Sequence, residues 1–335
     1  MTVTIKDVAK KSGVAPSTVS RVIADSPSIS QATKEKVRKV MHELNYFPNA
    51  NAQGLASNRS KTIGVILPLA SDAFYQNPFF PTVLRGINFG MSKVDYSILL
   101  SSGQTNEQRL NHIKKIVHGK KVEGLIFLYA SKNDPLLDFA LSTNIPTVVV
   151  GTPDKLKVHV VDNDNETIGK QATDYLIQKG CQNIAYIGGD MDQFFIKDRL
   201  KGYQIALEEN NRTYKEDYIY NDFAFLSTDG YQLIKNEIDL SLYDGFVIAD
   251  ELVANGIQQA LLEKKITQIR TITFKPFQQA LYHSNMGESY INLHTRLLGS
   301  RAVSILFDSI ENDNKGEQRY IREYVDGELV VMPEF

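Results

Sequence analysis

The chain has 335 residues, of which 42% are hydrophobic and 23% are charged. This length predicts two or three compact units, and the composition is typical of globular proteins, which excludes a mainly disordered chain or a fibre. No apolar run reaches the roughly 18 residues of a membrane-spanning helix, residues 1–13 lack a secretory signal, and the single Cys181 excludes a disulfide framework and a four-thiolate metal site. We therefore expect a cytoplasmic protein without membrane contact.

Charge is distributed unevenly along the chain. Residues 1–61 hold ten basic and four acidic side chains, a net charge of +6, which leaves −8 for residues 62–335. A basic head on an acidic body favours a polyanionic partner for the head alone, although small basic helical domains also have other uses.

Residues 5–44 carry apolar side chains at the i, i+3, i+4 spacing of three short helices. Gly13 suits a tight turn after the first helix, Pro16 suits the first turn of the second, and Ser30 is a good N-cap for the third. The pattern predicts a helix-turn-helix whose second helix exposes a reading face, or else a generic three-helix bundle with Arg21 merely solvated. The expected inward positions are Ile5, Val8, Ala9, Val19, Val22, Ile23, Val37, Val40, Met41 and Leu44.

Residues 46–60 predict a short helix after Pro48 that contains Gly54 and a single large apolar side chain, Leu55. An isolated helix of roughly eight residues is unstable in water. Such a segment suits folding against DNA, with Leu55 entering the minor groove, and the alternative is a plain flexible linker.

The segments TIKDVAKKSGVAPSTVSRVI and LNYFPNANAQGLAS resemble the DNA-binding head and hinge of the LacI/GalR family of transcriptional repressors. The resemblance implies a homodimer on operator DNA that responds to a small-molecule effector. Ala15 and the Gln53–Gly54 pair depart from frequent residues of that family. The implied DNA contacts are base reading by Pro16, Ser17 and Arg21, phosphate contacts by Thr4, Thr18, Ser20 and Asn49, and minor-groove contact at Ala52 and Leu55.

From Thr62 onward, short apolar runs alternate with amphipathic segments, which predicts βαβ units and parallel sheets. The expected fold class is a small all-α helix-turn-helix head plus an α/β periplasmic-binding-protein-like body of two doubly wound parallel-sheet lobes. We expect a hairpin turn at Asp326–Gly327 and a break between the sheets near Val158–Asp162. The predicted domains are a head over 1–47, a hinge over 48–61, an N-terminal lobe over 62–160 plus about 289–320, and a C-terminal lobe over 161–288 plus about 321–335.

The expected strands and helices of the body follow the same alternation. The strands are 63–69, 96–100, 125–129, 147–150, 184–187, 245–249 and 270–274. The helices are 82–93, 107–118, 135–142, 167–179, 200–209, 230–237, 252–264 and 296–310.

Motifs of enzyme chemistry are not found in the sequence: there is no phosphate-binding loop, no nucleophile elbow and no HExxH pair. We expect no catalysis, no metal and no cofactor. An α/β enzyme with a regulatory head and a sugar-binding transport component are rival interpretations, but the second gives the basic head no purpose.

Sugar binding requires hydrogen-bonding charged side chains and aromatic faces, which the ends of several predicted strands supply. The segments QNPFFPTVLRGI and SYINLHTRLLG resemble the maltose-operon repressors of Gram-positive bacteria, which implies maltose or a maltodextrin as effector. Lys275 and Pro276 stand where the wider family has an acidic effector contact. The alternatives are a global carbon regulator with a phosphoprotein corepressor and a purine- or phosphosugar-responsive repressor. The candidate effector residues are Phe79, Phe80, Asp164, Phe194, Phe195, Arg199, Asp250 and Phe274.

Overall fold

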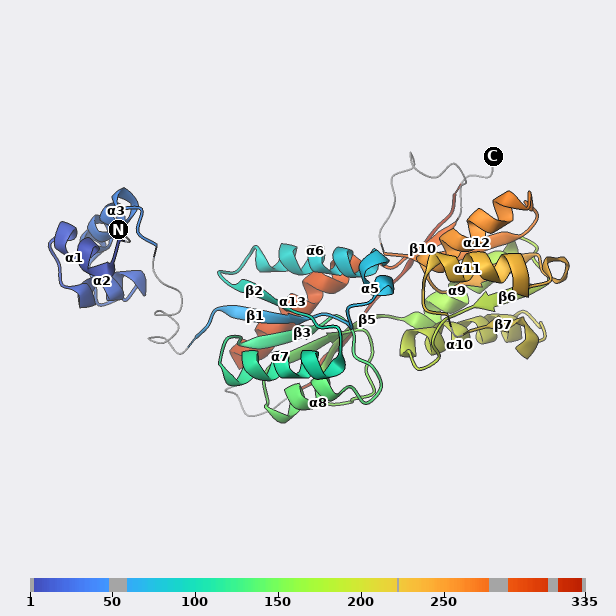
Figure 1. Cartoon of the computed structure of the whole chain (residues 1–335), viewed down its shortest axis with the longest axis horizontal. Coiled ribbons are helices and arrows are strands. Elements are labelled where there is room, and N and C mark those ends of the chain that lie inside the picture. The colour runs from blue at the N-terminus through green and yellow to red at the C-terminus, as the bar shows by residue number, and fades with distance from the viewer. Residues whose placement is uncertain (1–2, 48–58, 222, 277–288, 313–318, 333–335) are drawn as a thin grey trace. The chain divides into compact units, whose positions relative to one another are not determined.

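The computed structural model describes residues 3–47, 59–221, 223–276, 289–312 and 319–332. The chain forms two compact units, residues 1–61 and residues 62–335, whose helices and strands are labelled in Figure 1. Asn49, Ala52 and Leu55, three of the predicted DNA contacts, lie outside the described residues.

The first unit is a helix-turn-helix with a third supporting helix, as predicted. Gly13 ends the first helix with a φ of 67°, a left-handed conformation that costs glycine little. The Ser30 hydroxyl accepts a hydrogen bond from the Thr33 amide at 3.3 Å and so caps the third helix. Val8, Val19 and Val37 are fully buried at the centre of the core. The helices are α1 Ile5–Ser12, α2 Pro16–Ile23 and α3 Gln31–Glu43.

The first lobe of the body is a six-stranded parallel sheet in the order β11-β5-β4-β3-β1-β2. Helices α6 and α13 cover one face of this sheet, and α7 and α8 cover the other, so that two apolar cores form. The strands are β1 Thr62–Ile66, β2 Ser97–Ser101, β3 Gly124–Phe127, β4 Thr147–Val150, β5 His159–Asn163 and β11 Arg322–Val325. The helices are α5 Asp72–Gln76, α6 Phe79–Met91, α7 Asn106–His118, α8 Pro135–Ser142 and α13 Thr295–Asn312.

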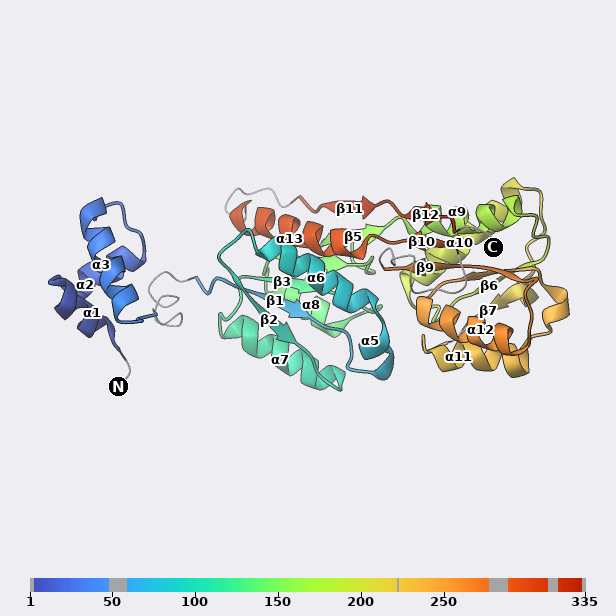
Figure 2. The ribbon, with the colours of Figure 1, turned by 90° about the horizontal axis from the view of Figure 1, so that it is seen from above.

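The second lobe is a six-stranded sheet in the order β12-β10-β9-β8-β6-β7, parallel except for β12, which runs antiparallel to β10. Figure 2 shows α9 and α10 on one side of this sheet and α11 and α12 on the other. The strands are β6 Ile184–Ile187, β7 Ile219–Tyr220, β8 Gly245–Ile248, β9 Arg270–Lys275, β10 Tyr290–Asn292 and β12 Glu328–Val330. The helices are α9 Asn165–Gln178, α10 Phe194–Glu209, α11 Ser227–Gln232, a π-helical turn Leu233–Glu237, and α12 Glu251–Glu263, with 3₁₀ turns at Glu216–Tyr218 and Leu240–Leu242.

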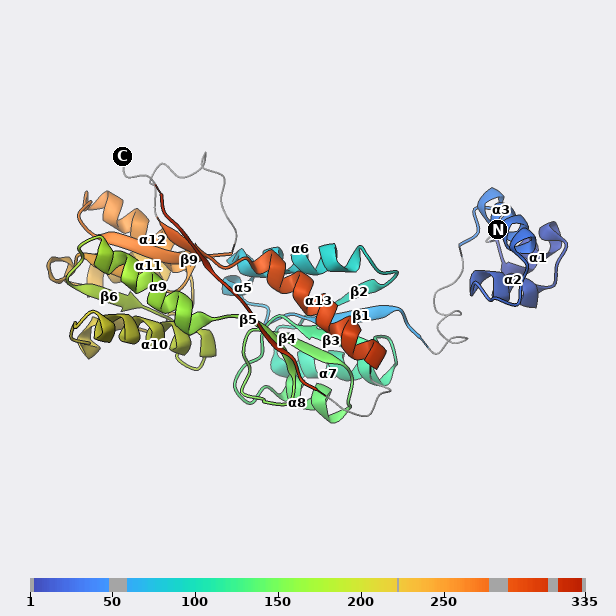
Figure 3. The ribbon, with the colours of Figure 1, turned by 180° about the vertical axis from the view of Figure 1, so that it is seen from behind.

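The chain passes between the lobes three times, after β5, after β10 and after β11 (Figure 3). Asn163 ties these three passages together. Its side-chain amide donates one hydrogen bond to the Leu293 carbonyl at 3.0 Å and another to the Val325 carbonyl at 2.8 Å. The crossing segments are therefore fixed to one another at the junction of the two lobes.

The predicted hairpin at Asp326–Gly327 is wrong. Strand β11 pairs with β5 in the first sheet and β12 pairs with β10 in the second, so residues 326–327 form a crossing instead of a turn. A Cβ atom at Gly327 would lie 2.6 Å from Ile168 and 2.9 Å from Ile291, so the glycine lets the chain pass close to these side chains.

The predicted break near Val158–Asp162 falls a few residues too early, because these residues lead into and form β5, a buried strand of the first sheet, and the chain crosses to the second lobe directly after it. Consequently, residues 161–163 and 322–325 belong to the first lobe rather than the second. Residues 290–292 belong to the second lobe rather than the first, as the last parallel strand of its sheet.

Candidate functional site

The exposed side of α2 carries the side chains that were predicted to read DNA bases. Pro16, Ser17, Ser20 and Arg21 are exposed, whereas Val19 and Val22 on the opposite side are buried. The side chain of Arg21 makes no hydrogen bond or ion pair with any residue that the structure describes. Its guanidinium therefore keeps its five donors for an external partner.

Other basic side chains of the same unit are engaged in ion pairs. Lys34 and Arg38 both contact the Asp25 carboxylate, at 2.9 Å and 2.6 Å, and Lys11 contacts Glu43 at 2.8 Å. The two remaining predicted DNA contacts among the described residues of this unit differ in exposure. Thr4 is exposed, and its hydroxyl donates a hydrogen bond to Asp7 at 2.7 Å, whereas Thr18 is partly buried. The unpaired Arg21 lies in the middle of an exposed helical surface, which is the arrangement that major-groove readout requires.

A cavity of about 500 Å³ lies between the two lobes of the body. Its walls come from the loops and helix starts that follow β1, β3 and β4 in the first lobe and β6, β8 and β9 in the second. Ligands of open α/β sheets bind at this end of parallel strands, so the cavity is the candidate ligand site of the body.

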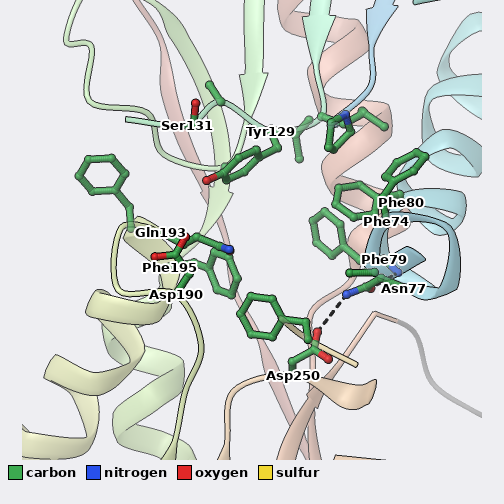
Figure 4. A pocket seen from close by; sticks show the side chains of 18 of the residues that line it. Phe74, Asn77, Phe79, Phe80, Tyr129, Ser131, Asp190, Gln193, Phe195 and Asp250 are labelled. Carbon is green, nitrogen blue, oxygen red and sulfur yellow. Dashed lines mark hydrogen bonds between the residues drawn. The ribbon is translucent and has the colours of Figure 1, made fainter. Parts of the chain in front are cut away.

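Aromatic side chains from both lobes face this cavity. Figure 4 shows Phe74, Phe79 and Phe80 gathered on the side of the first lobe, with Phe195 on the opposite side. The rings of Phe79 and Phe80 meet edge to face at 5.4 Å between centroids, and the rings of Phe195 and Phe225 stack at 6.0 Å. Such faces suit the apolar side of a pyranose ring.

Helix α6 begins at Phe79 and α10 at Phe194, three and six residues earlier than the sequence pattern predicted. Four of the five predicted aromatic residues therefore occupy the first turns of two helices that start at the cavity, and the fifth, Phe274, lies in β9. Of the eight predicted effector residues, seven line the cavity: Phe79, Phe80, Phe194, Phe195, Arg199, Asp250 and Phe274.

Arg199 is a buried cation held by both hydrogen bonds and aromatic rings. Its Nε donates to the Asn165 side chain at 3.0 Å, and one terminal nitrogen donates to the Ala249 carbonyl at 2.6 Å. The guanidinium carbon lies 4.1 Å from the centroid of the Phe274 ring. Burial lowers the pKa of Arg199 to about 10, because desolvation disfavours the charged form.

Asp250 links the two lobes at one edge of the cavity. One carboxylate oxygen caps α12 by accepting hydrogen bonds from the amides of Leu252 and Val253, at 2.7 Å and 3.3 Å. The other accepts a hydrogen bond at 3.0 Å from the Asn77 side chain of the first lobe, drawn in Figure 4. Burial raises the pKa of the Asp250 carboxyl group.

Asp164 is the one predicted effector residue that does not line the cavity. Its carboxylate caps α9, accepting hydrogen bonds from the Thr167 amide at 3.0 Å and the Thr167 hydroxyl at 2.7 Å. Its neighbours Asp162 and Asn165 line the cavity in its place.

Sequence reasoning missed the polar residues in the loops after the strands. Asn77, Tyr129 and Ser131 from the first lobe and Asp190 and Gln193 from the second line the cavity (Figure 4). Burial raises the pKa of Tyr129 to about 12, so that its hydroxyl is neutral and both donates and accepts hydrogen bonds. For Ser131 and Asp190 a usable signal existed, because they follow predicted strands of a parallel sheet within three residues.

Lys275, the last residue of β9, stands where the wider family has an acidic contact, and it does not line the cavity. It is buried with its ammonium 4.9 Å from the centre of the Tyr290 ring, while Pro276 reaches the cavity wall. Within the described parts of the chain, no cluster of His, Cys, Asp and Glu could hold a metal ion. No described helix has the length and apolar character of a membrane span.

An exposed reading helix and a two-lobed body with a ligand cavity, joined in one chain, define a ligand-controlled, DNA-binding regulator of transcription. Comparison with known proteins supports this class. The family model for bacterial regulatory proteins of the lacI family matches residues 4–49, and the model for periplasmic binding proteins and the sugar-binding domain of the LacI family matches residues 60–322. The chain therefore belongs to the LacI family.

Individual relatives agree over nearly the whole length. The chain is 41% identical to the HTH-type transcriptional regulator MalR of Streptococcus pneumoniae over 95% of this chain and 96% of the relative. It is similar to a transcriptional regulator CelR–cellobiose complex, with a TM-score of 0.74 and 25% identity over 98% of this chain and 99% of that chain. A Lac repressor dimer bound to operator and an anti-inducer has the same fold, with a TM-score of 0.83 and 23% identity over 99% and 98% of the two chains.

Proposed function

We propose that the protein is a homodimeric repressor of sugar-utilisation genes whose effector is maltose or a short maltodextrin. The observation that carries the proposal is the cavity between the lobes, lined by aromatic faces and by hydrogen-bonding side chains from both lobes. The 41% identity to a regulator named MalR supports an α-linked glucose oligomer as the effector class. In this proposal the cavity binds its ligand without turning it over, and the protein acts in the cytoplasm.

The cavity offers the two kinds of contact that a sugar needs. The rings of Phe79 and Phe195 supply flat apolar faces from opposite lobes, and Asn77, Ser131 and Gln193 supply neutral donors and acceptors for hydroxyl groups. Since the ligand contacts both lobes, its binding free energy depends on how the lobes face each other.

DNA binding is assigned to the exposed side of α2, with Arg21 contacting a guanine edge and Ser17 and Ser20 reaching bases or phosphates. Two copies of this helix in a dimer suit a near-palindromic operator. In the family that the hinge sequence resembles, Asn49, Ala52 and Leu55 contact DNA, and we propose the same role for them here.

Effector binding in this proposal shifts the two lobes relative to each other and weakens operator binding. A coupling of about 1–3 kcal/mol is typical for such linked sites. The effector therefore acts as an inducer.

Calorimetric titration of the full-length protein with maltose, maltotriose, cellobiose and adenine tests the ligand assignment. The proposal predicts saturable binding of maltose or maltotriose and weaker binding of cellobiose, whose β-linkage orients its second ring differently. Binding of adenine alone, or a stable complex with a phosphorylated carrier protein on size exclusion without any sugar binding, would contradict it.

A further inference from the structure

The charges around the cavity are strongly unbalanced. Among the residues that the structure describes, two guanidinium groups, of Arg109 and Arg199, line it, and no lysine or histidine does. Against these stand five carboxyl groups, those of Asp134, Asp162, Asp190, Asp250 and Glu251.

Both arginines are largely engaged by the protein. Arg199 is 5% exposed, donates to Asn165 and to the Ala249 carbonyl, and lies against the Phe274 ring. Arg109 is 6% exposed and donates to the Leu67 carbonyl at 2.8 Å and to the Asn106 side chain at 3.0 Å. Nε of Arg109 and the second terminal nitrogen of Arg199 have no described hydrogen-bond partner, so each arginine offers an anion one such nitrogen rather than a bidentate pair.

Helix N-termini are the other positive groups of a protein that bind phosphate, and several helices start at this cavity. Side chains of Ser71, Thr105, Asp134 and Asp164 cap α5, α7, α8 and α9. Asp250 caps α12 with its own carboxylate, and the Asn77 side chain accepts a hydrogen bond at 2.9 Å from the Phe79 amide at the start of α6. The start of α10 has no side-chain cap, but the loop that leads into it carries the Asp190 carboxylate, which also lines the cavity.

Polar groups suited to neutral hydroxyls are abundant by comparison. The amides of Asn77 and Gln193 and the hydroxyls of Tyr129 and Ser131 both donate and accept, and a carboxylate such as that of Asp190 accepts from a sugar hydroxyl. Burial raises the pKa of the carboxyl groups of Asp162 and Asp250, which shows that negative charge is already poorly solvated at this site.

We propose that the cavity selects uncharged saccharides and rejects their phosphorylated forms, with Asp190 as a specificity-determining residue. This inference rests on the proposed function, since it assumes that the cavity is the saccharide site. A phosphate group placed here meets carboxylates and, among the described lining residues, no lysine, no histidine and no arginine with both terminal nitrogens unengaged, so unfavourable like-charge contacts dominate.

The test compares maltose, maltose 6′-phosphate and uncharged 6′-O-acetyl maltose by calorimetry on the full-length protein. We expect the phosphate to weaken binding about tenfold or more relative to maltose, with the acetyl derivative, which adds bulk without charge, closer to maltose. Raising the salt concentration should reduce the difference between the affinities for maltose and for maltose 6′-phosphate, because salt screens charge repulsion.

Two variants test whether Asp190 causes the selectivity against phosphorylated saccharides. In the structure the Asp190 carboxylate accepts a hydrogen bond from the Asp192 amide at 2.8 Å, and the Asp190→Asn variant keeps an oxygen that can accept it. The variant removes one negative charge, so the preference for maltose over maltose 6′-phosphate should shrink at least threefold. Asp308→Asn removes one carboxylate from α13, outside the cavity lining, and should leave the ratio unchanged.

The outcomes separate the two proposals. Binding of maltose and its phosphate with equal affinity, or a preference that neither salt nor Asp190→Asn alters, would overturn the charge selectivity and leave the sugar-binding function intact. Absence of binding by all three saccharides would overturn the proposed function, and the selectivity with it.

Discussion

Arg21 and Arg199 carry the same guanidinium group, but their different burial gives them different roles. Arg21 is exposed on α2 and its side chain has no described partner, so it is available to a nucleic acid. Arg199 is buried among Phe274, Asn165 and Ala249, so it organises the wall of the cavity. The sequence pattern singled out both residues, and only the structure distinguishes an arginine side chain without a described partner from one held by hydrogen bonds and aromatic rings.

Replacing Arg21 by alanine should weaken binding to the operator by about 1–3 kcal/mol and relax the preference at one base position. Fluorescence anisotropy with operator and random duplexes measures both effects. Arg38→Ala, which removes a side chain already paired with Asp25, is the control and should cost little selectivity. Equal losses on operator and random DNA for Arg21→Ala would reduce its role to phosphate contact.

Phe195→Leu should weaken maltose binding about tenfold, because leucine preserves apolar volume but offers no flat face for the sugar ring. Calorimetry on the full-length protein measures this change. Phe139→Leu provides a matched control, since Phe139 packs against the other face of the first lobe and does not line the cavity. Similar maltose affinities for Phe195→Leu and the unaltered protein would remove Phe195 from the site.

At the scale of elements, the regular alternation of strand and helix was predictable and the crossings between lobes were not. Predicted strands such as Thr147–Val150 and Ile184–Ile187 agree with the structure because a continuous apolar run is the ordinary pattern of a buried parallel strand. The predicted break fell inside β5, a few residues before the true crossing, and residues 326–327 were mistaken for a hairpin, because neighbouring residues in the sequence pair with strands far away in the chain.

The residues of the candidate site also fall into those that the sequence predicts and those that it does not. Phe79, Arg199 and Asp250 could be predicted because they follow recognisable strand ends and resemble a family pattern. Asn77 and Tyr129 could not, since their place in the cavity depends on how one lobe faces the other. The early starts of α6 and α10 were missed because aromatic residues in a first turn break the helical spacing that predicts them.

Asn163→Ala should lower the free energy of unfolding of the body by about 1–3 kcal/mol, because the carbonyls of Leu293 and Val325 lose the donors that join the crossing segments. Urea denaturation measures the loss. Asn163→Asp, of the same shape but without the amide donors, should be at least as damaging, and Asn255→Ala on the exposed side of α12 should be nearly neutral. A neutral Asn163→Ala would mean that the crossings are held by other contacts.

For the molecule as a whole, a DNA-reading unit and a ligand-binding unit occur in one chain, and the segment between them contains Leu55, a predicted minor-groove contact outside the described residues. Leu55→Ala should reduce the bend of the bound operator without changing maltose affinity, because the cavity lies in the other unit. Gel mobility of circularly permuted operator fragments measures the bend. An unchanged bend would show that Leu55 does not act as a lever in the minor groove.

Coupling between the cavity and the reading helix is tested most directly by the operator affinity of the full-length protein, measured by fluorescence anisotropy with and without saturating maltose. The expected result is a loss of affinity of about 5- to 150-fold, the range of typical coupling free energies. An operator affinity that stays the same, or rises, while calorimetry shows maltose to be bound would contradict control of DNA binding by induction through this cavity.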